Sequence, residues 1–600
     1  MRKTKYVISV ISALTFCVAA FAQSDSALNR SVTVERDFQP IIQAAGKVAT
    51  KPAVVESNIE PAKVEYSEYT AEVPLGTNFN PLLSQPIRFG QGRAYNGYLR
   101  GGIGHINTLF DFGYHLDDDK NSILDVYAHH RAQWGCRALS KSKLGLNFTH
   151  TFTNSNLYFG INGGNIYYHK YGHFYDYSLV DPSAFAFDKV LYPTRDFQDK
   201  DKTCLWTAEA YFGLKSAATQ DVQYRFQTGY MLFAKIGAVS EHQVRTHLDL
   251  DWHSNAHHVG ANIYVQNNFL KLGSLSNVIA DSLYNNRHNL RIEPYYAYHG
   301  DRIQLHLGVN LDMNIGHGQN ALSGTDNLSF APSPHLRMEA QVAKNWLTVY
   351  MNIVGNHGFG TLQEFMEENR YRLIHAGITE HHSVAYTPID AELGFHIRPY
   401  RDLLFEIHGG FAYMMDQEVM IATTDSTHKF EELNIPFSPG DFNFFYTNYQ
   451  RAKVGGQINY HYQDLVRINL HGDYYFWSGD SAVYDRPNWE IGLRIDGKIN
   501  QHWSLYSDNY LAGSRWALAT DGVHQLKPTI ELNMGIQYET WVGRAAKILD
   551  KEKGTNMRPA PQPNLALFLQ LNNYINRKND IYYGYTTEGI NFLLGITYKF

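Results

Sequence analysis

The clearest pattern in this chain is a strict alternation of apolar and polar positions, which is most regular in Ile303–Ile315. Every second residue of that segment is Ile, Leu, Val or Met, and the residues between them are polar or Gly. Successive side chains of a β-strand point to opposite faces, so this period predicts a strand with one apolar and one polar face. The same alternation recurs in Phe110–Leu116, Val222–Leu232, Val244–Trp252, Ile530–Tyr538 and Gly589–Phe600.

The predicted strands are too long and too uniform for a soluble β-protein. They run for about nine to thirteen residues, enough to cross a bilayer at a tilt, whereas strands of soluble proteins usually have about five or six. Nearly all of them carry the same two faces, which suits lipid on one side and water on the other. We therefore predict an all-β fold, a transmembrane antiparallel β-barrel.

The connections between the predicted strands support this fold independently. Short polar turns such as Asp117–Lys120 and Ser254–His257 alternate with long segments such as Tyr168–Lys202, Asn356–Thr387 and Asp416–Tyr446. Outer-membrane barrels have short periplasmic turns and long outer loops, and they contain an even number of strands. Counting on this basis gives about 22 strands, within a range of about 18 to 24.

The start of the chain is organised differently. Residues 1–22 are typical of a secretory signal peptide, with three cationic residues before a short apolar stretch that ends in Ala20-Phe21-Ala22. Residues 23–92 show little alternation and contain six prolines, which predicts an extended periplasmic or lumenal segment. The barrel is expected over residues 93–600. Export and a barrel together predict the outer membrane of a Gram-negative-type cell.

The amino-acid composition and net charge indicate which partners the protein has. Aromatic residues make up 14% of the chain, as expected where Tyr and Trp occupy both membrane interfaces. Removing the signal peptide takes away three cations and no acid, so the formal net charge falls from −6 to −9, which argues against nucleic acid as a partner. Outer-membrane lipid and the barrel-assembly machinery are the expected partners. A surface lipoprotein or a periplasmic protein is a further candidate, the latter near residues 540–564, a long segment among the short turns.

The most specific residues lie in the C-terminal segment Leu565–Phe600. They are Asn572, Asn573, Asn576, Arg577, Gly584, Tyr585, Gly589, Phe592 and the terminal Tyr598-Lys599-Phe600. With them, the segment resembles the end of a TonB-dependent receptor barrel. The resemblance implies a barrel of about 22 strands and uptake of scarce ligands such as metal chelates, vitamins or glycans.

That family fills its barrel with a plug domain and engages an energising complex through a TonB box. Residues 23–92 are too few for such a plug, and Val32–Glu35 only weakly echoes a TonB box. The chain therefore resembles a plug-less relative of the family. Its last strand carries the aromatic end expected of a C-terminal barrel-assembly signal, formed by Phe592, Leu594, Ile596, Tyr598 and Phe600.

The polar faces of the predicted strands supply the candidate lumen residues. These are Arg225, Arg245, His247, Asp249, Asp251, His306, Asp312, Arg467, His471, Asp473, Glu490, Arg494, Asp496 and Glu531. They form either a hydrated, salt-bridged wall or a path for a polar ligand. Both signs of charge are present, so strong ion selectivity is not expected.

The 28 His residues raise the question of a metal site. The pairs His129-His130 and His257-His258 lie on predicted strands, where neighbours point to opposite faces and cannot share an ion. His381-His382 lies in a predicted loop, and no spacing typical of a metal motif supports it. We expect no metal site, no cofactor and no enzymatic activity, because no nucleophile with a base and an orienting group stands out.

Two functions follow as hypotheses. The first is a receptor-like barrel for the uptake or passage of a polar ligand, with its outer loops binding that ligand. The second is a structural or accessory barrel that forms part of a larger outer-membrane assembly or export complex.

Overall fold

The computed structural model describes residues 95–117, 121–134, 138–170, 202–217, 220–273, 286–316, 328–343, 346–372, 384–424, 429–430, 435–436, 440–463, 465–543 and 563–600. The predicted signal peptide, the segment 23–92 and most of the connection 540–564 lie outside these residues, as do His381 and His382. The first described strand begins at Gly97.

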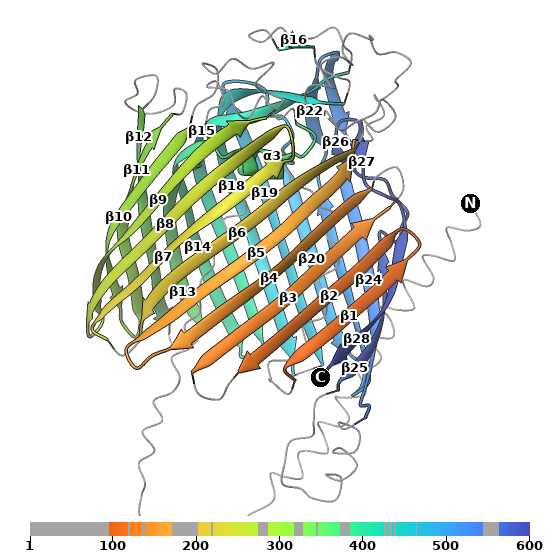
Figure 1. Cartoon of the computed structure of the whole chain (residues 1–600), viewed down its shortest axis with the longest axis horizontal. Helices are drawn as coiled ribbons and strands as arrows, with labels where there is room; N and C mark the ends of the chain where they lie inside the picture. Colours follow the sequence, from red (N-terminus) through yellow and green to blue (C-terminus); the bar gives the residue numbers. More distant parts are fainter. Residues whose placement is uncertain are drawn as a thin grey trace, which may run out of the picture. The chain divides into compact units, whose positions relative to one another are not determined.

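The described residues form a closed antiparallel barrel of 22 strands (Figure 1), which confirms the predicted fold class and strand number. Each strand pairs with the next along the chain, and the last strand, β28, returns to pair with β1. In that closing pair, Tyr98 lies opposite Lys599 and Gly104 lies opposite Leu593. Closure leaves no unpaired edge, as a spanning sheet requires.

The strand bounds are as follows: β1 (Gly97–Gly104), β2 (Asn107–Asp117), β3 (Ser122–Gln133), β4 (Leu139–Thr151), β5 (Ser155–His169), β6 (Lys202–Ser216), β7 (Val222–Lys235), β8 (Val239–Ser254), β9 (His257–Leu272), β10 (Arg287–His299), β11 (Ile303–Ile315), β12 (Leu328–Ala343), β13 (Leu347–His357), β14 (Tyr386–Tyr400), β15 (Leu403–Ala422), β18 (Phe442–Tyr462), β19 (Val466–Gly479), β20 (Trp489–Lys498), β21 (Trp503–Ala512), β24 (Thr529–Thr540), β25 (Leu565–Asn572) and β28 (Asn591–Lys599).

The two ends of the barrel differ in their connections. Turns such as 255–256 and 300–302 join strands at the end where Phe600 also lies, which we call the short-turn end. Longer connections, including 358–385 and 573–590, join strands at the other end, the long-loop end. This alternation matches the predicted one.

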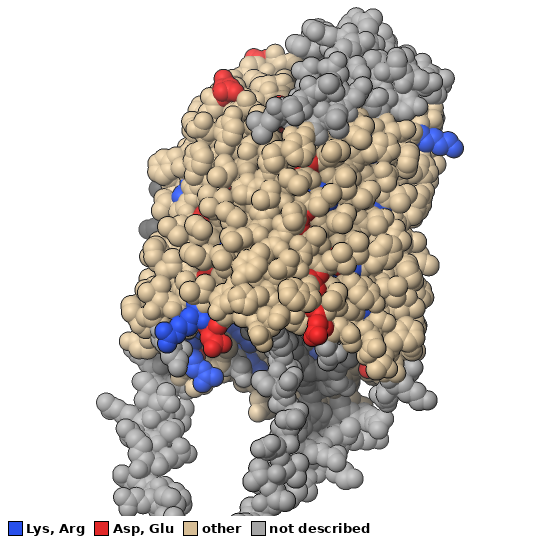
Figure 2. Space-filling view, turned by 90° about the vertical axis from the view of Figure 1, so that its left-hand side faces the viewer, with Lys and Arg blue, Asp and Glu red and all other residues tan. Residues whose placement is uncertain are grey.

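The wall has the inverse of a soluble protein's burial pattern. On β11, Leu307, Val309 and Met313 are 42%, 45% and 39% exposed, whereas Asp312 and Asn314 between and beside them are each 2% exposed. Apolar side chains on the outside suit a hydrocarbon surround. Figure 2 shows one such outer face, on which charged side chains are sparse at mid-height and gather near the lower edge.

Two strands are longer than the sequence pattern predicts. β15 has 20 residues and β18 has 21, so the predicted long connection Asp416–Tyr446 is wrong at both of its ends. Asp416 has a positive φ of 51°, and the pairing register shifts between Met414 and Gln417. This irregularity interrupts the alternation, and the sequence pattern therefore ends the strand too early.

Further short elements lie outside the barrel wall. A hairpin of β22 (Arg515–Ala519) and β23 (Gly522–Leu526) sits between β21 and β24, and β22 pairs in parallel with the end of β15. Two smaller hairpins pair β16 (Lys429–Phe430) with β17 (Ile435–Pro436) and β26 (Asp580–Tyr582) with β27 (Tyr585–Thr586). One helix, α3 (Leu362–Glu368), lies in the connection between β13 and β14. No helix in the described part of the chain is long and apolar enough to span a membrane.

Candidate functional site: the lumen and its long-loop end

The predicted lumen residues fall into two groups on the polar face of the wall. The first group lies on β7, β8 and β11, and its members pair with neighbours on the same face. Asp249 lies 3.8 Å from Arg225 and 2.7 Å from His247, both measured between side-chain N and O atoms. The Arg291 Nε atom lies 2.6 Å from the Asp312 Oδ1 atom. Charges on this side are therefore largely neutralised by direct contact.

The second group lies on β19, β20 and β24. Arg494 bridges Asp496 and Asp508 at 2.9 and 3.2 Å. The Tyr510 hydroxyl donates to Glu490 at 2.8 Å. Three further members contact neighbours on the same face. Asp473 accepts from His408 at 2.7 Å, Glu531 accepts from Asn533 at 3.3 Å, and a ring nitrogen of His471 lies 3.4 Å from the Asn469 side chain. Arg467 is the cross-strand partner of Asp496. Whether either group forms a ligand path stays a prediction.

Cross-strand contacts create side-chain clusters that the sequence analysis missed. Glu293 of β10 receives contacts from His306 of β11, at 3.0 Å, and from His335 of β12. Asp251 and His253 of β8 lie beside His258 of β9. The adjacent pair His257-His258 does split between two faces, as the strand period requires. A partner for His258 comes instead from the adjacent strand β8, where His253 lies directly opposite.

At the long-loop end, α3 lies within the upper part of the barrel (Figure 1). Its buried residues Leu362, Phe365 and Met366 belong to one apolar cluster with side chains from both sides of the wall. Leu205 of β6 is on one side and Phe442 of β18 is on the other. β6 and β18 are nearly opposite in the ring, since β7–β15 separate them in one direction and β19–β5 in the other. The connection 358–372 therefore crosses the opening.

Local sequence explains why this short helix forms. Thr361 caps its N-terminus, because the Thr361 side chain accepts from the Glu364 N–H while the Glu364 carboxylate accepts from the Thr361 N–H. This reciprocal capping box satisfies two amides that would otherwise lack partners. Seven residues are too few for a stable isolated helix. The apolar contacts with the wall therefore supply the remaining stabilisation of α3.

Polar anchors tie the start of this connection to β8 and β10. The carboxylate of Glu241, which is 1% exposed, accepts from the N–H groups of Leu362 and Gln363 at 2.9 and 3.1 Å. Arg287 of β10 donates to the carbonyl of Gly360. Arg291 donates to the carbonyl of His357 at 2.9 Å. The wall thus holds the backbone of the connection as well as its side chains.

The end of the connection is held by a buried arginine. Arg372, which is 1% exposed, pairs with Glu368 at 3.0 Å and with Glu418 of β15. Burial alone would lower the pKa of Arg372, but the two carboxylates outweigh it and raise the pKa above its ordinary value. The guanidinium therefore stays charged inside the closure.

Aromatic rings complete the closure. The rings of Tyr371 and Tyr585 stack with centroids 4.0 Å apart. The Tyr582 hydroxyl donates to the carbonyl of Glu368 at 3.0 Å, and the Tyr168 hydroxyl donates to the carbonyl of Arg370 at 2.6 Å. Burial raises the pKa of Tyr582 well above its ordinary value. The Tyr582 hydroxyl is therefore a neutral donor at physiological pH.

A buried acid lies in the neighbouring connection between β19 and β20. Asp485 is 8% exposed, has a φ of 56°, and donates its N–H to the carbonyl of Trp516 in β22. Burial raises the pKa of Asp485 to about 6, although Arg515 and Arg486 act in the opposite direction. The Asp485 carboxyl is therefore neutral in mild acid and ionised above about pH 6.

The short-turn end is more open and more polar. A cavity of about 390 Å³ lies there between the β14–β15 turn and strands β18–β20. Four arginines line it, Arg398, Arg401, Arg467 and Arg494, together with Asp402 and Asp496. Three of the fourteen predicted lumen residues, Arg467, Arg494 and Asp496, thus come together at this cavity.

The comparisons with known proteins bear on the fold. No protein-family model matches the chain, and no curated protein does. The copper transporter OprC has a similar fold with a TM-score of 0.59 at 12% identity, over 86% of this chain and 82% of that one. The siderophore receptor PirA from Acinetobacter baumannii is similar with a TM-score of 0.59 at 8% identity, over 84% and 80% of the two chains.

The ferric enterobactin receptor PfeA from Pseudomonas aeruginosa is a third similar structure, with a TM-score of 0.58 at 9% identity over 84% and 80% of the two chains. By their names, these three proteins are a copper transporter and two receptors, one for a siderophore and one for ferric enterobactin. At such low identity the likeness establishes a shared fold. The barrel of this chain is therefore similar in fold to these three proteins.

Proposed function

We propose that this protein is an outer-membrane barrel of the TonB-dependent-receptor type that works without a separate plug domain. Its role would be the uptake or passage of a polar ligand through the lumen. The observation that carries this proposal is the closure at the long-loop end, where the connection 358–372 fills the opening with apolar and buried ionic contacts. In the part of the chain that the structure describes, every segment is a barrel strand or a connection between two strands.

The polar wall supports passage of a hydrated ligand. Below the closure, charged and amide side chains continue along both sides of the barrel. Wide barrels leave a lumen that must be occluded when idle. A loop that is fixed to the wall by contacts that can be broken is one way to do so. The outer loops would then contact the ligand first and release the closure.

Conductance in planar bilayers tests this proposal. The wild-type barrel should be closed or nearly so, and a variant in which a Gly-Ser linker replaces residues 358–385 should show stable, large conductance. A large steady conductance of the wild type would contradict the closure. Silence of both proteins, together with co-purifying partners, would favour the alternative of an accessory barrel in a larger assembly.

A further inference from the structure

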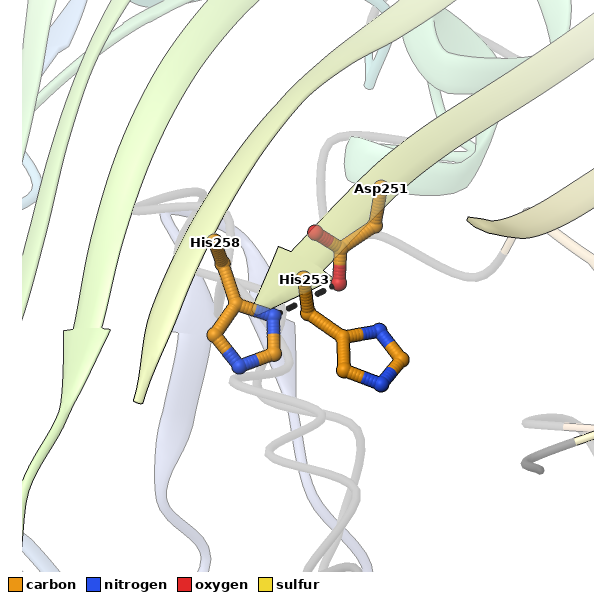
Figure 3. A group of neighbouring side chains, drawn as sticks. All are labelled: Asp251, His253 and His258. Atoms are coloured by element: carbon orange, nitrogen blue, oxygen red, sulfur yellow. Dashed lines mark hydrogen bonds and ion pairs between the residues drawn. The ribbon is translucent and has the colours of Figure 1, made fainter. Parts of the chain in front are cut away.

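We propose that Asp251, His253 and His258 bind a divalent transition-metal ion of the Zn²⁺ class at the short-turn end of the lumen. Figure 3 shows the three side chains lying close together on adjacent strands. One ligand atom from each residue lies within 4.8 Å of the others. Imidazole nitrogen and carboxylate oxygen are the donors that such ions prefer.

The register of β8 and β9 builds this site. His253 and His258 are direct cross-strand partners, and their rings stack with centroids 5.4 Å apart. Asp251 lies on the same face as His253, two residues earlier, and its Oδ2 atom is 2.9 Å from the His258 Nδ1 atom. On the far side of His258, the His299 ring of β10 lies with its centroid 4.4 Å away. The site is thus enclosed on two sides by histidines.

Unsatisfied buried atoms point to a missing ligand. The Asp251 Oδ1 atom and the His253 Nδ1 atom are both buried and lack a hydrogen-bond partner. Leaving a buried polar atom without a partner is energetically unfavourable. Among the residues that the structure describes, Asp251 forms an ion pair with His258 only, so no Lys or Arg occupies the position that a cation would take.

The second His and carboxylate cluster differs at its carboxylate, although its His335 Nε2 atom is also buried without a partner. In that cluster, Glu293 accepts from His306, His335 and Asn262, so both of its oxygens have donors. Hydrogen bonding within the cluster therefore uses both oxygens of Glu293 and leaves none for an ion. The Asp251 cluster has a spare acceptor and a spare imidazole nitrogen, which its own contacts do not explain.

The geometry needs only a small adjustment to hold the ion. Zinc binds nitrogen at about 2.0–2.1 Å and oxygen at about 2.0–2.2 Å, so tetrahedral ligand atoms lie about 3.3 Å apart. Asp251 and His258 are already slightly closer than that, and rotation of the His253 ring brings its nitrogen nearer. The fourth position would be open to water in the lumen.

The inference is independent of transport, because it is tested on the purified barrel in detergent without a polyhistidine tag. Zinc chloride is titrated against a chromophoric competitor, and cobalt chloride is then used to record the visible bands of a tetrahedral site. The wild type should bind one equivalent that both His253→Ala and His258→Ala weaken by at least about 100-fold. Losing an outer-shell partner typically costs about 10–100-fold, and losing a ligand costs more.

Two controls make the result specific. His257→Ala alters the same dipeptide on the opposite face of the wall, and Glu293→Gln alters the second cluster; both should leave zinc affinity unchanged. Heat-modifiable mobility in electrophoresis verifies folding, and His253→Gln and His258→Gln replace any Ala variant that does not fold. The proposal is overturned if the wild type binds no stoichiometric zinc, or if His257→Ala or Glu293→Gln reduces affinity as much as His258→Ala does.

Discussion

The two ends of this barrel are built on different physical principles. The long-loop end is packed as a protein core, with Leu362, Phe365 and Tyr585 each 2% exposed or less and Arg372 at 1%. Toward the short-turn end, the ion pairs of the wall are partly exposed, as in His247–Asp249, whose side chains are 39% and 25% exposed. Removing one partner of a buried ion pair is costly because the other charge is left buried, whereas an exposed pair contributes little. The contrast teaches that closure of the lumen is concentrated at one end.

The largest effect is expected where a buried charge loses its partner. Arg372→Met leaves Glu418 buried without its cation, which typically costs about 3–5 kcal/mol. Hydrogen exchange of the amides in Leu362–Glu368 should therefore accelerate by about 100-fold to 1,000-fold or more. Arg401→Met, which changes an exposed arginine in the β14–β15 turn, is the matched control. Equal exchange rates of the α3 amides in the two variants would contradict the proposed difference in stability between the two ends.

Asp485 gives the closure a pH dependence whose sign follows from its raised pKa. In the folded protein this carboxyl titrates at about 6, whereas an unfolded Asp titrates at about 3.9. Ionisation of the buried acid therefore opposes folding, and its stabilising neutral form is lost as the pH rises from about 4 to about 6.

Asp485→Asn removes this titration and keeps a residue that tolerates a positive φ. Its stability should equal that of the wild type near pH 4 and exceed it by about 3 kcal/mol above pH 7. Thermal unfolding in detergent at several pH values measures the difference. A stability gap between the two proteins that does not grow with pH would show that Asp485 is not buried as described.

A smaller effect is expected at the start of the closure. Glu241→Gln keeps one acceptor for α3 but removes the carboxylate that receives the N–H groups of Leu362 and Gln363. Loss of a cap typically costs about 1 kcal/mol, so exchange of the α3 amides should rise by roughly fivefold. Glu339→Gln on β12 is the control, and a similar rise in that variant would contradict the role of Glu241.

The smallest effect is expected at the short-turn end. Asp249→Asn breaks the contacts with His247 and Arg225, which are partly exposed and thus contribute about 0–1 kcal/mol. Neither the melting temperature of the barrel nor the exchange of α3 should change measurably. A large loss of stability, or faster exchange of α3, would show that contacts at this end also stabilise the closure.

Much of the wall follows from the sequence, because alternation on β11 or β28 depends only on the strand period. The closure at the long-loop end could not be predicted from the sequence in this way. Leu362, Phe365 and Met366 lie in a segment without strand alternation, and their partners on β6 and β18 are far away in the sequence. The sequence analysis missed the His253–His258 pair for a related reason. The two residues are brought together by the pairing register of β8 and β9, which cannot be read from either strand alone. The irregularity at Asp416 interrupts the apolar–polar alternation of β15, so the sequence pattern predicts a strand that is too short.

Thiol labelling tests the central claim that the long-loop end is closed by the connection 358–372. In a background with Cys136→Ser and Cys204→Ser, a single cysteine is placed in the lumen by His306→Cys. A membrane-impermeant maleimide added to intact cells should not label it. The same cysteine should be labelled when a Gly-Ser linker replaces residues 358–385. Labelling of the intact barrel at the rate of the linker variant would contradict the account.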